Sequence, residues 1–143
     1  MTAPRLSGLR RVFVDTSALY APLDESDSNH RPAISIMTRL AAEPSQLLTT
    51  NWILAEAHAL TLSRLGRHAA LQFLEAVDTS STRLIRVTAA DEERARAILR
   101  QYDDKDFSLT DASSFAVMER LRMSEAFSFD RNFSQYGLTV LAE

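Results

Sequence analysis

Four carboxylates occupy positions in this chain where an enzyme could hold a metal ion. Asp15 ends the run VFVD, Asp130 ends FSFD, Asp111 lies in SLTD, and Glu56 lies in WILAEAHAL. Hard divalent cations such as Mg²⁺ prefer carboxylate oxygens as ligands. A cation held in this way activates water and neutralises charge on a phosphoryl group. The four acids are therefore candidates for a site that hydrolyses phosphate esters.

Each acid also has an ordinary structural explanation. Asp15 and Asp130 follow apolar runs, where aspartate commonly caps a turn. Asp111 lies three residues after Ser108, which is the spacing of a helix capping box. Capping and metal binding are compatible, because a helix N-terminus favours a carboxylate. Glu56 has apolar neighbours and no basic partner one turn away, and burying a lone carboxylate is costly, so we expect a metal or another polar site to compensate it.

The apolar pattern predicts strands that alternate with helices. The predicted strands are 11–15, 46–50, 82–88, 125–129 and 138–141. The predicted helices are 27–43, 52–65, 67–78, 89–102 and 109–123, with another that starts at Thr16 and Ser17 and has Ser17 as its N-cap. This order indicates an α/β fold with a central, mostly parallel sheet flanked by helices in three layers. Ligands bind such sheets at the carboxyl ends of the strands, which is where Asp15 and Asp130 lie.

Composition narrows the class of protein. A chain of 143 residues fits one domain, 1–143, and it has no cysteine, so disulfides and thiolate chemistry are excluded. No apolar run is long enough for a membrane span or a signal peptide, so we expect a cytoplasmic protein. The formal net charge of −3 argues against a general nucleic-acid binder but not against an enzyme that holds its substrate through bound cations. The few glycines allow neither a P-loop nor a serine nucleophile elbow.

Four segments together resemble the signature motifs of PIN-domain nucleases. They are VFVDTSALYA at 12–21, ILAEAH at 53–58, DFSLTDASSFAVM at 106–118 and FSFDRNF at 127–133. Within that family the chain most resembles the VapC-type toxins of bacterial toxin–antitoxin pairs. The resemblance implies Mg²⁺- or Mn²⁺-dependent cleavage of RNA, with Asp15, Glu56, Asp111 and Asp130 as the catalytic acids. It further implies that Asp15, Asp111 and Asp130 are the candidate metal ligands and that Ser17, Thr110 and Asn132 assist. We expect direct contact from Asp15 and from Asp111 or Asp130, with Glu56 binding through water or orienting the nucleophile; the sequence leaves open which acids ligate and whether one metal or two are bound.

The resemblance also implies partners, namely a cognate antitoxin and a second copy of the chain in a homodimer. We expect an antitoxin helix to lie near the predicted helices 27–43 and 52–65, because Ile36 and Leu62 fall outside their main apolar faces. On the first of these helices the expected inward residues are Ala33, Ile34, Met37, Leu40 and Ala41.

Other functions remain open at this point. The chain could be a PIN nuclease for RNA processing, or a metal-stabilised PIN domain that binds RNA or protein without cutting. A haloacid-dehalogenase-like phosphatase also begins with an aspartate after its first strand, but it needs a second aspartate at position 17, where this chain has serine.

Overall fold

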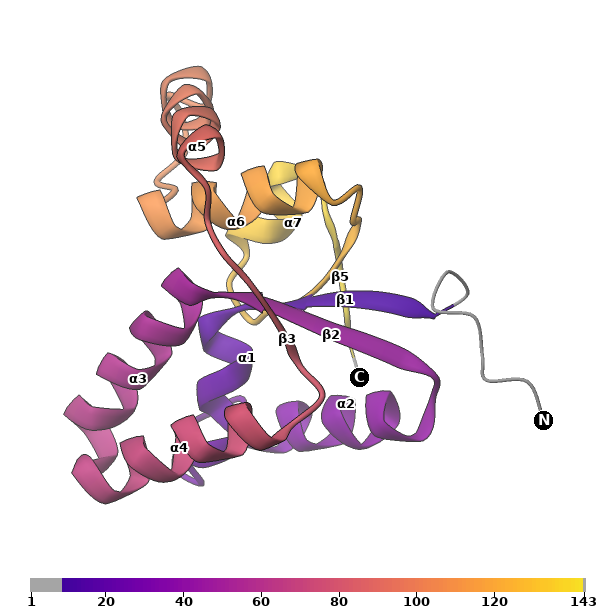
Figure 1. The fold of residues 1–143 in the computed structure, drawn as a ribbon, viewed down its shortest axis with the longest axis vertical. Helices are drawn as coiled ribbons and strands as arrows, with labels where there is room; N and C mark the ends of the chain where they lie inside the picture. Colours follow the sequence, from indigo (N-terminus) through magenta and orange to yellow (C-terminus); the bar gives the residue numbers. More distant parts are fainter. Residues whose placement is uncertain (1–8, 143) are drawn as a thin grey trace.

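The computed structural model describes residues 9–142 and contains one parallel sheet covered by helices on both faces (Figure 1). The strands are β1 (Arg10–Val14), β2 (Ser45–Thr50), β3 (Arg83–Ile85), β4 (Glu125–Phe127) and β5 (Thr139–Val140), in the spatial order β3-β2-β1-β4-β5. All four strand pairs are parallel. The predicted three-layer α/β fold is therefore confirmed.

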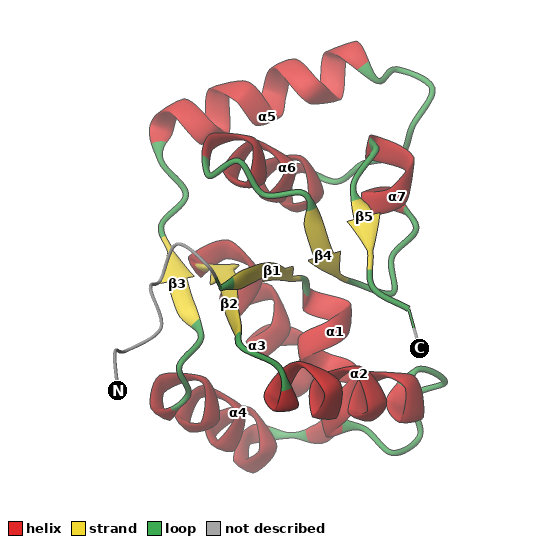
Figure 2. Ribbon diagram, turned by 90° about the vertical axis from the view of Figure 1, so that its right-hand side faces the viewer, coloured by secondary structure: helices red, strands yellow, loops and turns green. Residues whose placement is uncertain are grey.

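The helices divide between the two faces of the sheet. One side carries α1 (Thr16–Tyr20), the 3₁₀ turn η2 (Ala21–Leu23), α2 (His30–Ala42), α3 (Asn51–Leu65) and α4 (Arg67–Thr79), as Figure 2 shows. The other side carries α5 (Ala89–Gln101), α6 (Leu109–Arg120) and α7 (Asn132–Tyr136). No helix within residues 9–142 is long and apolar enough to cross a bilayer.

Alternation along β1 builds the two apolar cores. Phe13 points into a cluster with α5, α6 and α7, whereas Val12 and Val14 point into a second cluster with α1 and α2. This is the period-two pattern of a strand buried on both faces. In the first cluster Phe115 stacks on Tyr136 at 4.4 Å between ring centroids, so α7 is packed directly on α6.

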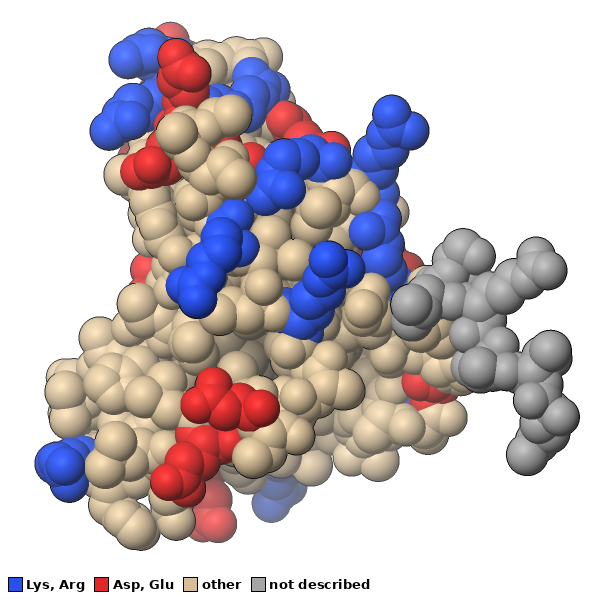
Figure 3. Space-filling view, in the orientation of Figure 1, with Lys and Arg blue, Asp and Glu red and all other residues tan. Residues whose placement is uncertain are grey.

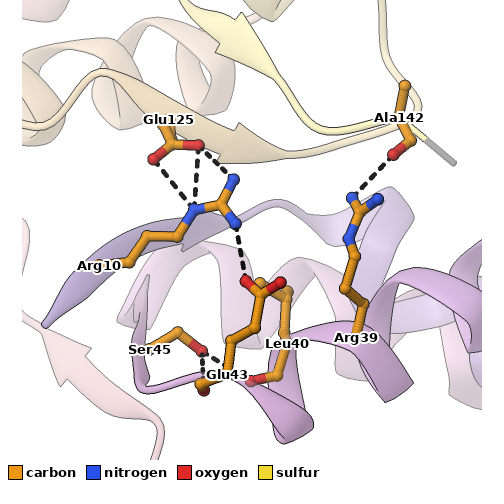
Figure 4. A network of polar contacts seen from close by, with 7 residues as sticks. All are labelled: Arg10, Arg39, Leu40, Glu43, Ser45, Glu125 and Ala142. Atoms are coloured by element: carbon orange, nitrogen blue, oxygen red, sulfur yellow. Dashed lines mark hydrogen bonds and ion pairs between the residues drawn. The ribbon is translucent and has the colours of Figure 1, made fainter.

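Polar contacts tie the amino ends of β1 and β4 to α2 (Figure 4). Arg10 donates from Nη2 to Glu125 at 2.6 Å and from Nη1 to Glu43 at 3.2 Å. The Arg10 guanidinium lowers the pKa of the Glu125 carboxyl below its usual range. Arg39 of α2 donates to the carbonyl of Ala142 at 2.8 Å, which joins α2 to the end of the described chain.

Two predictions about local structure were wrong. Ser17 is not the N-cap of α1, because Asp15 holds that position, without a side-chain capping bond. On α2 the buried residues are Ala33, Ile36 and Leu40, whereas Ile34 and Met37 are 43% and 44% exposed. The face of α2 that packs on the sheet is formed by residues 33, 36 and 40. The predicted buried face was therefore turned about the helix axis relative to the true one.

Helix ends were predicted more accurately. Gly66, with φ +93°, separates α3 from α4 in a backbone conformation that favours glycine. The Ser108–Asp111 capping box at the start of α6 is present with both of its hydrogen bonds. The helix α7 was not predicted, because its five residues are too short to show a helical period.

Candidate metal centre

The candidate site lies beyond the carboxyl ends of the neighbouring strands β1 and β4. The backbone N–H of Asp15 donates to the carbonyl of Phe127 at 3.1 Å, which continues the pairing of these two strands by one residue. The residues that follow Phe127 therefore lie beside Asp15.

Asp15 is almost fully buried, with 4% of its surface exposed. Its Oδ2 accepts hydrogen bonds from Ser128 at 2.9 Å and from Ser17 at 3.0 Å. The pKa of the Asp15 carboxyl is raised to about 6, chiefly by burial and to a smaller extent by the nearby charge of Asp111, whereas the hydrogen bonds from the two hydroxyls oppose the rise. The site therefore holds a carboxylate whose negative charge is poorly compensated by protein groups.

Ser17 and Ser128 hold Asp15 and also fix the loop after β4. Ser17 Oγ accepts from the backbone N–H of Phe129 at 2.9 Å, and Ser128 Oγ accepts from the N–H of Asp130 at 3.0 Å. Ser128 was missed by the sequence analysis, although it is 3% exposed. The signal was available, because it is the one polar residue inside the apolar run that leads to Asp130.

Asp111 reaches the same site from the first turn of α6. Its Oδ2 accepts the capping bond from the N–H of Ser108 at 3.0 Å and a second bond from Asn132 Nδ2 at 2.9 Å. The Asp111 side chain therefore caps α6 and also contacts Asn132 of the candidate site. Asp111 is 8% exposed, so a second buried carboxylate lies at this edge of the sheet.

Asn132 connects Asp111 with the third acid, Asp130. The backbone N–H of Asn132 donates to Asp130 Oδ1 at 2.9 Å, and its side-chain amide lies 3.5 Å from Asp130 Oδ2. A continuous set of polar contacts therefore joins Asp15, Asp130 and Asp111, through Ser128 on one side and Asn132 on the other.

Two predicted site residues lie outside this set of contacts. Glu56 is exposed, because α3 buries Ile53, Ala57 and Thr61 instead, so the expectation of a buried, uncompensated glutamate was wrong. Thr110 is partly buried, and the contacts it makes are through its carbonyl, which accepts from Ser113 and Ser114. Within residues 9–142 no three acidic or histidine side chains already stand close enough together to enclose a metal ion.

The donor set nevertheless fits a hard divalent cation. Asp15, Asp111 and Asp130 are aspartates from three different elements, and none of them forms an ion pair with a basic side chain in the described part of the chain. Buried carboxylates without cationic partners are normally compensated by a bound ion. Oxygen ligands from one or two carboxylates, with water in the remaining positions, suit Mg²⁺.

The profile of the family described as "PIN domain" matches residues 12–138, which contain every residue of this site. The chain belongs to the PIN-domain family. The 23S rRNA-specific endonuclease VapC20 of Mycobacterium tuberculosis is 34% identical to this PIN domain over 126 residues, which are 88% of this chain and 94% of VapC20. The ribonuclease VapC26 of the same organism is 26% identical over 120 residues, 84% of this chain and 87% of VapC26.

Solved structures agree with the sequence relatives. The crystal structure of VapC20, described as a sarcin–ricin loop cleaving toxin, superposes on this PIN domain with a TM-score of 0.83 and covers 92% of this chain and 99% of that one. A toxin–antitoxin complex from Klebsiella pneumoniae, at 18% identity and a TM-score of 0.65 over 92% of this chain and 96% of that one, shares the fold. This PIN domain is thus a nuclease of the VapC type.

The predicted partner surface needs a correction. Ile36 is 1% exposed and lies in the core beneath α2, whereas Leu62 on α3 is 45% exposed as expected. An apolar hollow of about 170 Å³ lies between η2, α2 and α4, rather than between α2 and α3, and Leu23, Met37 and Phe73 are among the side chains that line it.

Proposed function

We propose that this chain is a Mg²⁺- or Mn²⁺-dependent endoribonuclease that acts as the toxin of a VapBC-type pair. The observation that carries the proposal is the set of polar contacts through Ser128 and Asn132 that links Asp15, Asp111 and Asp130 at one edge of the sheet, where none of the three has a basic partner in the described residues. The kinship with VapC20 and VapC26 supports RNA as the substrate.

The side chains divide the work as follows. Asp15, Asp111 and Asp130 hold the cation, which supplies an activated water and neutralises charge on the phosphoryl and leaving oxygens. Ser17 and Ser128 keep the Asp15 carboxylate in place, since both donate to its Oδ2.

The amide of Asn132 aligns Asp111 with Asp130. Glu56 and Thr110 assist in this proposal, Glu56 by binding the cation through water or by orienting the nucleophile.

A cleavage assay tests the nuclease assignment. Purified protein is incubated with RNA and Mg²⁺ or Mn²⁺, and Asp15→Asn is compared with the wild type after circular dichroism shows that both are folded. Asp24→Asn is the matched control, because Asp24 is an aspartate in the loop after η2, with Tyr20 and Ser26 as its hydrogen-bond donors. Absence of cleavage by the wild type would refute the nuclease assignment, and full cleavage by folded Asp15→Asn would show that Asp15 is not one of the catalytic acids.

The target proposed from the kinship is ribosomal RNA, since VapC20 is named as a 23S rRNA-specific endonuclease. Primer extension on RNA from treated ribosomes locates the cut. Cleavage of many unrelated RNAs, with no preferred position in ribosomal RNA, would exclude this target and favour the processing role.

The proposed partners are an antitoxin and a second copy of the chain. We propose that a segment of the antitoxin binds in the apolar hollow lined by Met37 and Leu23, because both apolar side chains are exposed to solvent there. Expression of the chain alone should arrest growth, and a small protein encoded beside it should restore growth. Unimpaired growth together with strong cleavage of a defined precursor RNA would favour the processing nuclease instead.

A further inference from the structure

An arginine-rich surface runs from the end of β3 to the segment between α6 and β4 and has no part in the candidate metal centre. We call it the arginine band and define it as Arg11, Arg83, Arg86, Arg120 and Arg122. Hydrogen bonds connect two pairs of its members, since Arg120 Nη2 donates to the carbonyl of Arg86 at 3.3 Å and Arg11 Nη2 donates to the carbonyls of Leu121 and Arg122 at 2.7 and 3.4 Å. Arg83 begins the edge strand β3, and Arg86 directly follows the end of that strand.

Most of the charge on the band is uncompensated. Arg120 forms a two-pronged pair with Asp91, but Arg11, Arg83, Arg86 and Arg122 form no ion pair within residues 9–142. In the view of Figure 3, basic side chains gather across the middle of this face, and the acidic ones lie mainly above and below them. This concentration is notable in a chain whose net charge is −3. Clustered like charges repel, so an anionic ligand would stabilise the surface.

The backbone conformation of Arg122 also suggests that its positive charge has a role in binding. Arg122 has φ +56°, the left-handed conformation that follows a helix end and normally favours glycine or asparagine. An arginine is less favourable than glycine in this backbone conformation, yet the position holds an arginine whose side chain is exposed and positively charged.

The band reaches the edge of the sheet that carries the acids. In the register of β1, β2 and β3, Phe13 lies opposite Leu48, and Leu48 lies opposite Arg83. Two residues further along each strand, Asp15, Thr50 and Ile85 therefore lie side by side across the sheet. At the usual spacing between strands, Ile85 lies about 10 Å from Asp15, and Arg86 is the next residue. One polynucleotide strand could therefore contact Arg86 and the acid cluster at the same time.

A hollow of about 470 Å³ opens at this end of the band, lined by Arg86 with Asn51 and His58 of α3. Asp78 also lines it, but forms no ion pair with Arg86 among the described residues. Unstacked bases of RNA commonly stack on aromatic side chains or arginine guanidinium groups and form hydrogen bonds at their edges, and His58, Arg86 and Asn51 offer such contacts in this hollow.

We infer that the arginine band binds the phosphate backbone of the RNA substrate on one side of the scissile bond, and leads that strand past Arg86 to the acids. This inference rests on the proposed ribonuclease function. It assigns a binding role to residues that no catalytic motif contains.

The test compares two double variants with the same change in charge. Arg86→Ala with Arg122→Asn removes two charges from the band, and the asparagine suits the left-handed backbone, so the fold is not put at risk by that change. Arg31→Ala with Arg67→Ala removes two exposed arginines of α2 and α4 that have no ion pair within residues 9–142.

Both double variants are made in the Asp15→Asn protein, and binding of a fluorescein-labelled RNA hairpin is followed by anisotropy at several salt concentrations in EDTA. Loss of two phosphate contacts should make the slope of log K against log [salt] shallower by about 1.4, if the bound segment is single-stranded. The control double variant should keep the slope of its parent. Equal slopes for the band and control variants would overturn the inference.

Sedimentation of each variant separates RNA binding from contact between copies of the chain. Loss of RNA affinity supports the inference only where the sedimentation coefficient is that of the parent protein. A changed coefficient assigns the band to contact between copies and overturns the inference. Absence of metal-dependent RNA cleavage by the wild-type protein would refute the nuclease function whatever the band binds, so the two failures are distinguishable.

Discussion

Neutralising Asp15 should stabilise the metal-free protein at neutral and alkaline pH. Asp15→Asn keeps the size of the side chain and an oxygen that can accept from Ser17 and Ser128, but it removes the buried charge. The pKa of Asp15 rises from 3.8 to about 6 in the folded protein, chiefly because of burial. A rise of this size corresponds to roughly 3 kcal/mol, which is the upper limit of the gain.

The sign follows from proton linkage. With a raised folded pKa, the carboxyl group favours folding below its unfolded pKa near 4, and this contribution is lost as the pH rises through about 6. In EDTA at about pH 8 we expect Asp15→Asn to be more stable than the wild type by about 1–3 kcal/mol. For a chain of this length the gain is roughly 4 °C in melting temperature per kcal/mol. At about pH 4 the two proteins should melt together.

Mn²⁺ should reverse the order of stability. A cation that binds only the folded protein stabilises it by about 4.1 kcal/mol at one thousand times its Kd, which exceeds the advantage of Asp15→Asn without metal, and Asp15→Asn should gain much less from the cation. Asp24→Asn is the control with the opposite sign, because the hydrogen bonds from Ser26 and Tyr20 lower the pKa of Asp24. Differential scanning fluorimetry measures all three proteins. If Asp15→Asn melted below the wild type at about pH 8 without metal, the hydrogen bonds of the carboxylate would outweigh its burial, and this reasoning would fail.

Three further changes examine other parts of the molecule. Asn132→Ala removes the amide between Asp111 and Asp130, and should weaken Mn²⁺ binding or cleavage by about 10–100-fold, measured by calorimetry and RNA assay; unchanged Mn²⁺ affinity and cleavage would exclude a positioning role. Because Glu56 is exposed, Glu56→Gln should alter the unfolding free energy by less than about 0.5 kcal/mol in urea titrations, yet it should slow cleavage; wild-type rates would remove Glu56 from the site. Phe115→Ala should cost about 3–5 kcal/mol, because Phe115 is 0% exposed and packs on the aromatic rings of α7; a loss below about 1 kcal/mol would show that α7 is not held by this contact.

The fold was largely predictable because its strands are short, apolar and separated by helices with clear ends. β1, β2 and α3 were predicted to within a residue at each end. β3 was predicted as 82–88 but is Arg83–Ile85, since the residues after Ile85 leave the sheet to form the N-cap of α5. Helical periodicity indicates only approximately which side of an amphipathic helix is buried. This explains why Ile36 of α2 was wrongly placed outside the buried face.

The site was predictable where an acid follows a strand and harder to predict elsewhere. Asp15 and Asp130 lie together because parallel strands bring their carboxyl ends to one edge. The bridging contacts of Ser128 and Asn132 depend on the loop after β4, whose conformation no local sequence pattern specifies. The exposure of Glu56 depends on which side of α3 meets the sheet, which is a tertiary property.

The central position of β1 has a consequence for the biosynthesis of the protein. β1 is made first and pairs with β4, one of the last strands, so Asp15 and Ser128 meet across 113 residues of chain. Chains emerge from the ribosome N-terminus first, at about 5–20 residues per second. A nascent chain that ends before Asp130 and Asn132 lacks a third of its acid cluster and the amide that aligns it. The acid cluster therefore cannot be complete until translation has passed Asn132, so any shorter nascent chain lacks the full metal-binding site that we propose.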